Sequence, residues 1–447
     1  MNTNFPEQPS IPGQLNLSAQ QTKRRRNMRL FGGLCALAFL LVSALVTALV
    51  LGSTHRAVQA SGGAPTPTPT VGTPAPGQPR PNGSLYTATP GSLARVDLKT
   101  GQTVWTIQAS DPSAPVVMGN TLFFENQDSA NPFIEAANVK TGQQLWRTQQ
   151  SPYGLLLSSN NELFDNFCNL SSTGTTCSLD RINTSTGAVL WSSTNSQGSS
   201  WITAQNGVLY VVSYTSYFAL KASTGAVLWQ KNLLNYPNQE ATMAPVVSGN
   251  VLSFASCNET KQTSDYQSCY LYAFNASTGN ELWHLIVPPG ALQVGALQAT
   301  PAIMHGVVYA GAIDGTLYAV NEQSGQQLWS ASAGGTIGQV FASAGTVYVE
   351  VISPDGTSSI EAFNTATHAL IWGPLSDVSQ PQGATTLLAD REALSGGPAS
   401  HPFVFEYGLI YLQSGPTTIT VLKATNGSQV AQYTVSSGTL DGFTVVA

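Results

Sequence analysis

The chain has 447 residues, of which 42% are hydrophobic and only 9% are charged, with 41 glycines and 26 prolines. Soluble proteins carry about 25% charged residues, and long helical bundles and coiled coils depend on that charge, so this composition excludes them. The formal net charge of −6 is unevenly placed: residues 1–81 hold seven basic residues and one acidic residue, whereas residues 82–447 hold 10 basic and 22 acidic residues. The acidic body argues against nucleic-acid binding.

The N-terminal part predicts a membrane anchor. The 22 residues from Leu30 to Leu51 carry no charge, and about 20 such residues span a bilayer. The basic residues at 23–26 and Arg29 precede this run, so the positive-inside rule places the N-terminus in the cytoplasm. We therefore expect residues 1–29 to be a cytoplasmic basic stub and residues 30–51 a transmembrane signal anchor. The protein would be a single-pass cell-membrane protein whose main body is extracytoplasmic.

Two alternatives for this segment stay open. Val-Gln-Ala at 58–60 resembles a signal-peptidase site, which would give cleavage near Ala60, but the apolar run is longer than the roughly 7–15 residues of a signal h-region. Cys35 could be lipidated, although Gly-Gly-Leu before it is a poor lipobox. Residues 52–81 are expected to be a Pro/Thr-rich linker, because seven prolines between 61 and 81 favour an extended polyproline II spacer.

One sequence unit recurs eight times after residue 82. Typical copies are RVDLKTGQTVW at 95–105 and AVNEQSGQQLW at 319–329, and the eighth, VLKATNGSQVA, ends at Ala431 without tryptophan. The endings lie 38 to 59 residues apart, and a period near 45 with variable insertions is typical of a repeat architecture. The tryptophans that end the other seven copies, which we expect to dock neighbouring repeats, are Trp105, Trp146, Trp191, Trp229, Trp283, Trp329 and Trp372.

Each unit predicts a four-stranded antiparallel sheet. In residues 301–329, short β-prone runs are separated by turn residues. Asp314-Gly315 predicts a type I′ hairpin turn, and Asn321 and Gly325 predict a turn that needs a left-handed glycine. Such units in tandem build a β-propeller, in which each sheet is a blade. We expect the repeated tryptophan, at the end of the outermost strand, to pack against the adjacent blade.

The two ends of the repeat region complement each other. The region begins with NGSLYTA at residue 82, which matches the second strand of a blade, and it ends with GFTVVA at 442–447, which matches a missing inner strand. Joining them would close the ring and remove open sheet edges. The sequence therefore predicts an all-β, eight-bladed propeller over residues 82–447 that is closed by the C-terminal strand. Seven blades would result if the copy ending at Ala431 were not a blade.

The TGxxLW signature resembles the pyrroloquinoline-quinone (PQQ) dehydrogenase-type propeller repeat. Quinoprotein alcohol dehydrogenases and outer-membrane barrel-assembly (BamB-like) lipoprotein scaffolds share this repeat. For a dehydrogenase the resemblance implies adjacent cysteines, a calcium site and an aspartate base, but the chain has no adjacent cysteines. PQQ is therefore not supported, and we predict no cofactor, metal or catalytic residue. His368 replaces glycine and Ala431 replaces tryptophan in their copies, so those two blades should dock less regularly.

Four cysteines follow the predicted anchor. Cys177 and Cys269 each lie ten residues before the turn glycine of their repeat, and each has an upstream partner across the same hairpin, Cys168 or Cys257. Paired cysteines in an exported domain indicate disulfides. We predict the bonds Cys168–Cys177 and Cys257–Cys269. A metal site would need closer spacing and nearby histidines.

The remaining features favour binding over catalysis. Residues 288–300 and 373–400 are long insertions, of which the second contains Asp390, Arg391 and Glu392 as a possible recognition loop or a neutral surface excursion. We expect a non-catalytic scaffold that binds a protein or an envelope polymer through its loops. One alternative is a PQQ-dependent or related oxidoreductase. Another is a sensor ectodomain, but the cytoplasmic stub is too short to contain a signalling domain. The histidines lack metal-site spacing: His284, His305, His368 and His401.

Overall fold

The computed structural model describes residues 81–446, apart from 129–130, 150–155, 172–173, 196–199, 214–215, 234–238, 242–243, 260–265, 288–299, 313, 353–357, 374–402, 416 and 436–438. These residues form thirty-three β-strands. Within them there is no helix of the length and apolarity that crossing a membrane requires. The predicted span at 30–51 and nearly all of the linker at 52–81 lie outside the described residues.

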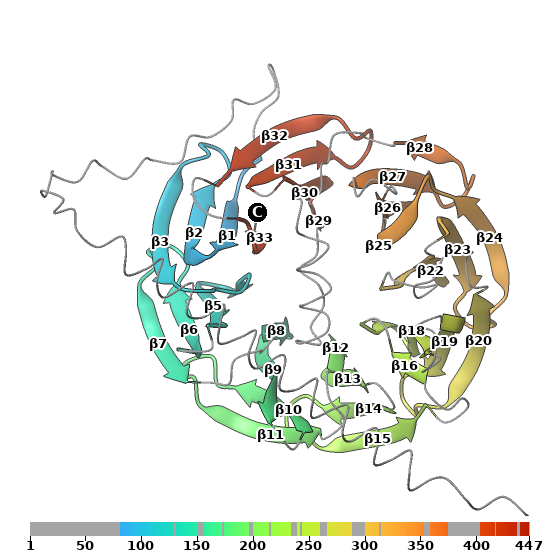
Figure 1. Cartoon of the computed structure of the whole chain (residues 1–447), viewed down its shortest axis with the longest axis horizontal. Coiled ribbons are helices and arrows are strands. Elements are labelled where there is room, and N and C mark those ends of the chain that lie inside the picture. Colours follow the sequence, from blue (N-terminus) through green and yellow to red (C-terminus); the bar gives the residue numbers. More distant parts are fainter. Residues whose placement is uncertain are drawn as a thin grey trace, which may run out of the picture. The chain divides into compact units, whose positions relative to one another are not determined.

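The strands form eight separate antiparallel sheets that follow one another around a ring (Figure 1). We number these blades 1 to 8 in chain order. Blade 1 contains β33 (Gly442–Val446), β1 (Ser84–Thr89), β2 (Gly91–Asp97) and β3 (Thr103–Ala109), from the inner to the outer strand. Blades 2 to 4 follow in the same inner-to-outer order: β4 (Val116–Met118), β5 (Thr121–Asn126), β6 (Phe133–Asn138) and β7 (Gln144–Gln149); β8 (Leu156–Ser159), β9 (Glu162–Ser171), β10 (Gly174–Ile182) and β11 (Val189–Asn195); β12 (Ser200–Gln205), β13 (Val208–Ser213), β14 (Ser216–Lys221) and β15 (Val227–Asn232).

Blade 5 departs from the four-stranded plan. Its inner position holds two short strands, β16 (Gln239–Ala241) and β17 (Val246–Ser248), which both pair with β18. The remaining strands of blade 5 and those of blades 6 to 8 are β18 (Val251–Glu259), β19 (Tyr266–Asn275) and β20 (Glu281–Val287); β21 (Ala302–Met304), β22 (Val307–Gly311), β23 (Thr316–Asn321) and β24 (Gln327–Ser332); β25 (Thr336–Ser343), β26 (Thr346–Ile352), β27 (Ser358–Asn364) and β28 (Leu370–Trp372); β29 (Phe403–Glu406), β30 (Leu409–Gly415), β31 (Thr418–Lys423) and β32 (Gln429–Thr434).

The ring closes through the two ends of the repeat region. Strand β33 pairs antiparallel with β1, and Val445 lies directly opposite Leu85. Phe443 and Val445 are both buried, in the apolar cluster that joins blade 8 to blade 1. Both predictions, an eight-bladed ring and its closure by the C-terminal strand, are confirmed, because the copy that ends at Ala431 forms blade 8.

One of the two predicted turns has the expected geometry, and the other does not. In the turn after β23, the Asn321 side-chain oxygen accepts hydrogen bonds from the backbone N–H groups of Gln323 and Ser324, and Gly325 has a φ of +71°. The type I′ prediction at Asp314-Gly315 is wrong. The Ala312 N–H group donates to the Thr316 carbonyl across the turn, which makes a loop longer than two residues, and Gly315 has a φ of +82°. The Asp314 carboxylate accepts a bond from the Thr316 N–H group.

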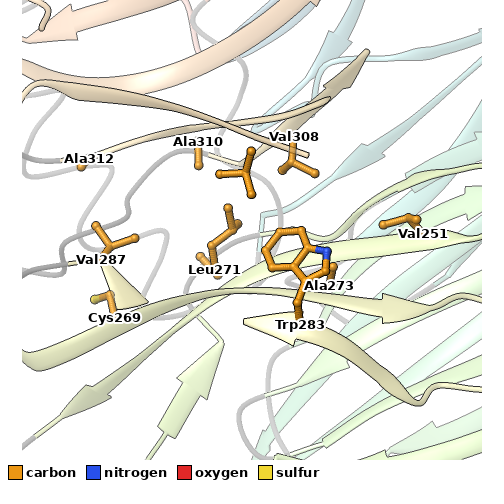
Figure 2. Packing of buried hydrophobic residues seen from close by; sticks show 11 residues of the cluster. Val251, Cys269, Leu271, Ala273, Trp283, Val287, Val308, Ala310 and Ala312 are labelled. Carbon is orange, nitrogen blue, oxygen red and sulfur yellow. The ribbon is translucent and has the colours of Figure 1, made fainter. Parts of the chain in front are cut away.

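The core is divided among the junctions between blades. Eight clusters of buried apolar residues are present among the described residues, and each one joins two consecutive blades. Figure 2 shows the cluster between blades 5 and 6, where Leu271 and Trp283 of blade 5 face Val308 and Ala310 of blade 6. A single sheet cannot cover both of its faces, so each blade depends on its neighbours for burial.

Candidate functional site

The repeated tryptophans form the junctions between blades. In six of the seven tryptophans the indole N–H group donates to a backbone carbonyl in the β-turn that precedes the outer strand of the next blade, at the same repeat position each time. The donor–acceptor pairs, all 2.8–3.0 Å apart, are Trp105–Val139, Trp146–Thr184, Trp191–Ala222, Trp229–Ala276, Trp283–Glu322 and Trp372–Ala424. These six residues therefore connect consecutive blades.

The position of the tryptophan in its strand differs from the prediction. It lies near the beginning of the outer strand, since β7 starts at Gln144 and continues to Gln149 beyond Trp146. The register shifts opposite this point, where Trp146 faces Ala136 and Gln144 faces Ala137. A shift of this kind is present in all eight blades, and a bulge of this type twists a strand and redirects its side chains.

The turn glycine of the repeat is required by this packing. A Cβ atom placed on Gly279 would lie 2.5 Å from Cε3 of Trp229, and the glycine has a φ of +70°. Glycine adopts the left-handed conformation readily, and because it has no side chain, the indole ring can lie directly against its backbone. The same contact recurs at the preceding blades, where Gly187 lies under Trp146 and Gly225 under Trp191.

The junction between blades 6 and 7 replaces glycine by histidine. His368 keeps the left-handed backbone, with a φ of +62°. Its imidazole ring stacks on Trp329, with ring centroids 4.8 Å apart and an angle of 21° between the planes. The expected irregularity of this copy is therefore a stacking contact in place of the indole-on-glycine contact.

The junction between blades 8 and 1 replaces tryptophan by another donor. Ala431 is buried, and Tyr433, two residues later on β32, donates from its hydroxyl group to the backbone oxygen of Leu98 at 2.6 Å. Leu98 occupies in blade 1 the position that Val139 occupies in blade 2. The tyrosine thus makes the inter-blade bond that tryptophan makes elsewhere, which the repeat pattern does not reveal.

The predicted cysteine pairs lie opposite each other in adjacent strands. Cys168 of β9 is the register partner of Cys177 of β10, and Cys257 of β18 is that of Cys269 of β19. Cys177 and Cys269 are buried and disulfide-bonded. Directly opposed residues of an antiparallel pair have Cα atoms about 4.5–5.5 Å apart, within the range that a disulfide spans. This register supports the predicted pairing.

Removing one of these bonds should lower stability measurably. For Cys269→Ser in blade 5, we expect a loss of about 2–3 kcal/mol in the free energy of unfolding, because the bond closes a short loop in the unfolded chain. Denaturant unfolding measures the loss, and peptide mapping without reductant identifies the partner of each cysteine. A peptide in which Cys269 is joined to any cysteine but Cys257 would contradict the pairing.

A polar pocket of about 270 Å³ lies between blades 1 and 2. Arg147 contributes to its wall, with its guanidinium 3.9 Å from the centre of the Phe133 ring. The same guanidinium is ion-paired with the buried carboxylate of Glu135, and its Nε donates to Oε2 at 2.8 Å. The lining contains mostly amides and small residues: Gly91, Gln108, Ala109, Ser110, Asn126 and Asn131. The one cation of this pocket already has a counter-ion.

The predicted histidines that the structure describes lie in three different blades: His284, His305 and His368. His284 lies on an outer strand with its Nδ1 2.7 Å from Oε1 of Glu281, and His305 is one of two positive-φ residues of a hairpin turn. His401 and nearly all of the insertions 288–300 and 373–400 lie outside the described residues. Within the described part of the chain, no three His, Cys, Asp or Glu side chains are grouped as a metal ion requires.

Exposed aliphatic side chains mark the outer strands. In seven blades the residue directly before the tryptophan position is 41–54% exposed, as with Leu145 at 54% and Leu228 at 51%. The members of this set, which we term the aliphatic belt, are Val104, Leu145, Leu190, Leu228, Leu282, Leu328 and Ile371. In blade 8 the corresponding Val430 is buried.

The family model of outer membrane protein assembly factor BamB matches residues 56–176, 175–332 and 267–442. These overlapping matches include every blade. The chain belongs to this family.

Two curated relatives are each 25% identical over part of the chain. One is tetrathionate hydrolase of Acidithiobacillus ferrooxidans, aligned over 272 residues, or 58% of this chain and 47% of the relative. The other is outer membrane protein assembly factor BamB of Yersinia pestis, aligned over 215 residues, or 48% of this chain and 42% of the relative. The chain thus spans less than half the length of either relative.

Solved structures share the fold at low identity. The computationally designed Ika8 protein superposes with a TM-score of 0.53 and 16% identity, covering 74% of this chain and 89% of the designed one. Sqt1 of Saccharomyces cerevisiae gives a TM-score of 0.53 and 10% identity, covering 83% and 100%. At these identities the likeness concerns the propeller fold alone.

Proposed function

We propose that the protein is a membrane-tethered, extracytoplasmic propeller that binds other proteins of the cell envelope as a non-catalytic scaffold. The observation that carries this proposal is the aliphatic belt on the outer strands, because exposed apolar surface on a soluble domain is typical of protein-interaction sites. Membership of the BamB family supports the same role. The tether is the apolar segment 30–51.

Site-specific photo-crosslinking in native membranes tests this role. A photoreactive residue at Leu228 should capture a partner protein, and one at Gln230, an exposed polar position on the same strand, should not. Leu228→Asn should weaken co-purification of that partner from membranes. Equal capture at both positions would contradict a role for the belt.

The second candidate is an enzyme, either the PQQ-dependent or related oxidoreductase considered from the sequence or a hydrolase. Its support is the similarity to tetrathionate hydrolase. The purified full chain should then bind PQQ and support dye-linked dehydrogenase turnover, or it should hydrolyse tetrathionate. Turnover in either assay would displace the scaffold proposal, since a scaffold needs no chemistry.

A further inference from the structure

The polar pocket between blades 1 and 2 has walls that are held by hydrogen bonds. These walls come from the turn between β1 and β2, the end of β3 and the loop between β5 and β6. The Gly91 N–H group donates to the carbonyl oxygen of Ser110 at 2.9 Å. The buried Asn126 side chain accepts from the Asp111 N–H group at 2.9 Å and donates to the carbonyl oxygen of Asn131 at 2.7 Å. The pocket is thus formed before any ligand enters, which lowers the entropic cost of binding.

Three neutral side chains of this pocket have unused hydrogen-bonding groups. They are the amides of Gln108 and Asn131 and the hydroxyl group of Ser110, and all three residues are exposed. None of these side chains has a hydrogen-bond partner in the part of the chain that the structure describes. An amide offers both donors and an acceptor, and so does a hydroxyl group. Such a mixture complements a ligand that itself carries hydroxyl groups.

Arg147 adds hydrogen-bond donors to the pocket without adding net charge. Its Nε and Nη2 atoms donate to the carboxylate of Glu135, which is buried. The guanidinium also lies over the Phe133 ring, and these contacts fix its orientation. Its Nη1 atom has no partner among the described residues. An anionic ligand would therefore meet a charge that is already balanced, and a cationic ligand would meet the guanidinium.

The size of the pocket and its backbone narrow the class of ligand further. The volume of about 270 Å³ is close to the lower end of the range of about 300–1,000 Å³ for small-molecule sites. An extended peptide strand would bind mainly through main-chain hydrogen bonds. The backbone N–H groups of Gly91, Asp111 and Gln127, however, already donate within the protein. Recognition is left to side chains, which suits a small polar group.

We propose that this pocket binds a neutral sugar unit. The two amides, the Ser110 hydroxyl group and the Nη1 atom of Arg147 bond to the hydroxyl groups of the sugar. The buried side chains of Ala109 and Phe133, which also line the pocket, contact its C–H groups. The site contains no residue of the aliphatic belt, so it stands or falls independently of the scaffold proposal.

Saturation-transfer difference NMR on the full chain tests the proposal. The probes are three neutral trisaccharides, maltotriose, cellotriose and triacetylchitotriose, in a detergent without a sugar head group, so that the detergent does not compete. We expect at least one of them to bind. Trigalacturonate, which carries carboxylates, should bind more weakly, because residues 82–447 hold 22 acidic and 10 basic residues. Triglycine tests the peptide alternative. No signal from the three neutral sugars, or tighter binding of triglycine, would overturn the proposal.

Two alanine variants test the location of the site. Gln108→Ala and Asn131→Ala each remove a side chain without a partner in the described fold, so we expect the wild-type melting temperature. Each should weaken binding of the sugar up to about tenfold, which corresponds to the loss of one hydrogen bond. The matched control is Gln144→Ala, an exposed glutamine at the first position of β7 and outside the pocket, which should bind as the wild type does. Unchanged affinity in both pocket variants, or an equal loss in the control, would contradict this site.

Discussion

Removal of residues 442–447 should abolish the cooperative fold of the propeller. The deletion takes away β33, exposes the inner edge of β1 and removes the buried Phe443 and Val445 from the cluster between blades 8 and 1. Two such side chains contribute about 3–6 kcal/mol, a large part of the 5–15 kcal/mol that stabilises a typical native protein. We expect a thermal melt by circular dichroism to be broad and shifted to much lower temperature, with aggregation in gel filtration.

A strand transplant separates ring closure from simple loss of sequence. The same deletion with GFTVVA inserted directly before Asn82 would supply the inner strand as a hairpin with β1, in the order that internal blades use. We expect this variant to regain most of the melting temperature and to elute as the wild type does. If the transplant folded no better than the deletion variant, the C-terminal strand would not stabilise the protein by completing blade 1.

Gly279→Ala should be among the most destabilising single-methyl additions in the protein. The new Cβ would lie 2.5 Å from Cε3 of Trp229, and alanine would also have to adopt a φ of +70°. Strain in the left-handed region costs about 1–2 kcal/mol and overpacking a further 1–3 kcal/mol. We therefore expect a loss of about 2–5 kcal/mol in denaturant unfolding.

Gly249→Ala in the same blade is the control for this substitution. Gly249 also has a positive φ, +55°, but a Cβ at this position would meet nothing within 4 Å. Its cost should be the conformational part alone, about 1–2 kcal/mol. Equal losses for the two variants would show that contact between glycine and indole does not decide the strength of the junction.

The repeat explains why much of the fold could be predicted from sequence. The recurring Trp and Gly make one contact at each blade junction, so the number of repeat copies predicts the number of blades. The incomplete blade at each end of the repeat region predicts closure of the ring. The pattern could not reveal Tyr433, because this residue acts from a position two residues beyond the one that the repeat marks. Asp314-Gly315 misled because a dipeptide does not distinguish a two-residue turn from a longer one.

The burial of Glu125, Asp165 and Asp180 could not be predicted from the sequence for a different reason. These three residues come from strands of two different blades, β5, β9 and β10, and the sequence carries no signal for a contact between blades at these positions. Charges that meet across an interface leave no local signal, whereas charges that share a motif do. The cysteine pairs could be predicted from the sequence, because both members of each pair lie in the same hairpin.

The shared first blade has a consequence for biosynthesis. Its inner strand is made last, so blade 1 stays incomplete, and blade 8 lacks a finished neighbour, until residues 442–446 have emerged. The contact between Leu85 and Val445 joins the most distant parts of the domain, and such long-range contacts are slow to form. A chain interrupted anywhere during synthesis would thus present an open sheet edge at the gap, where proteases and chaperones can recognise an unfinished molecule.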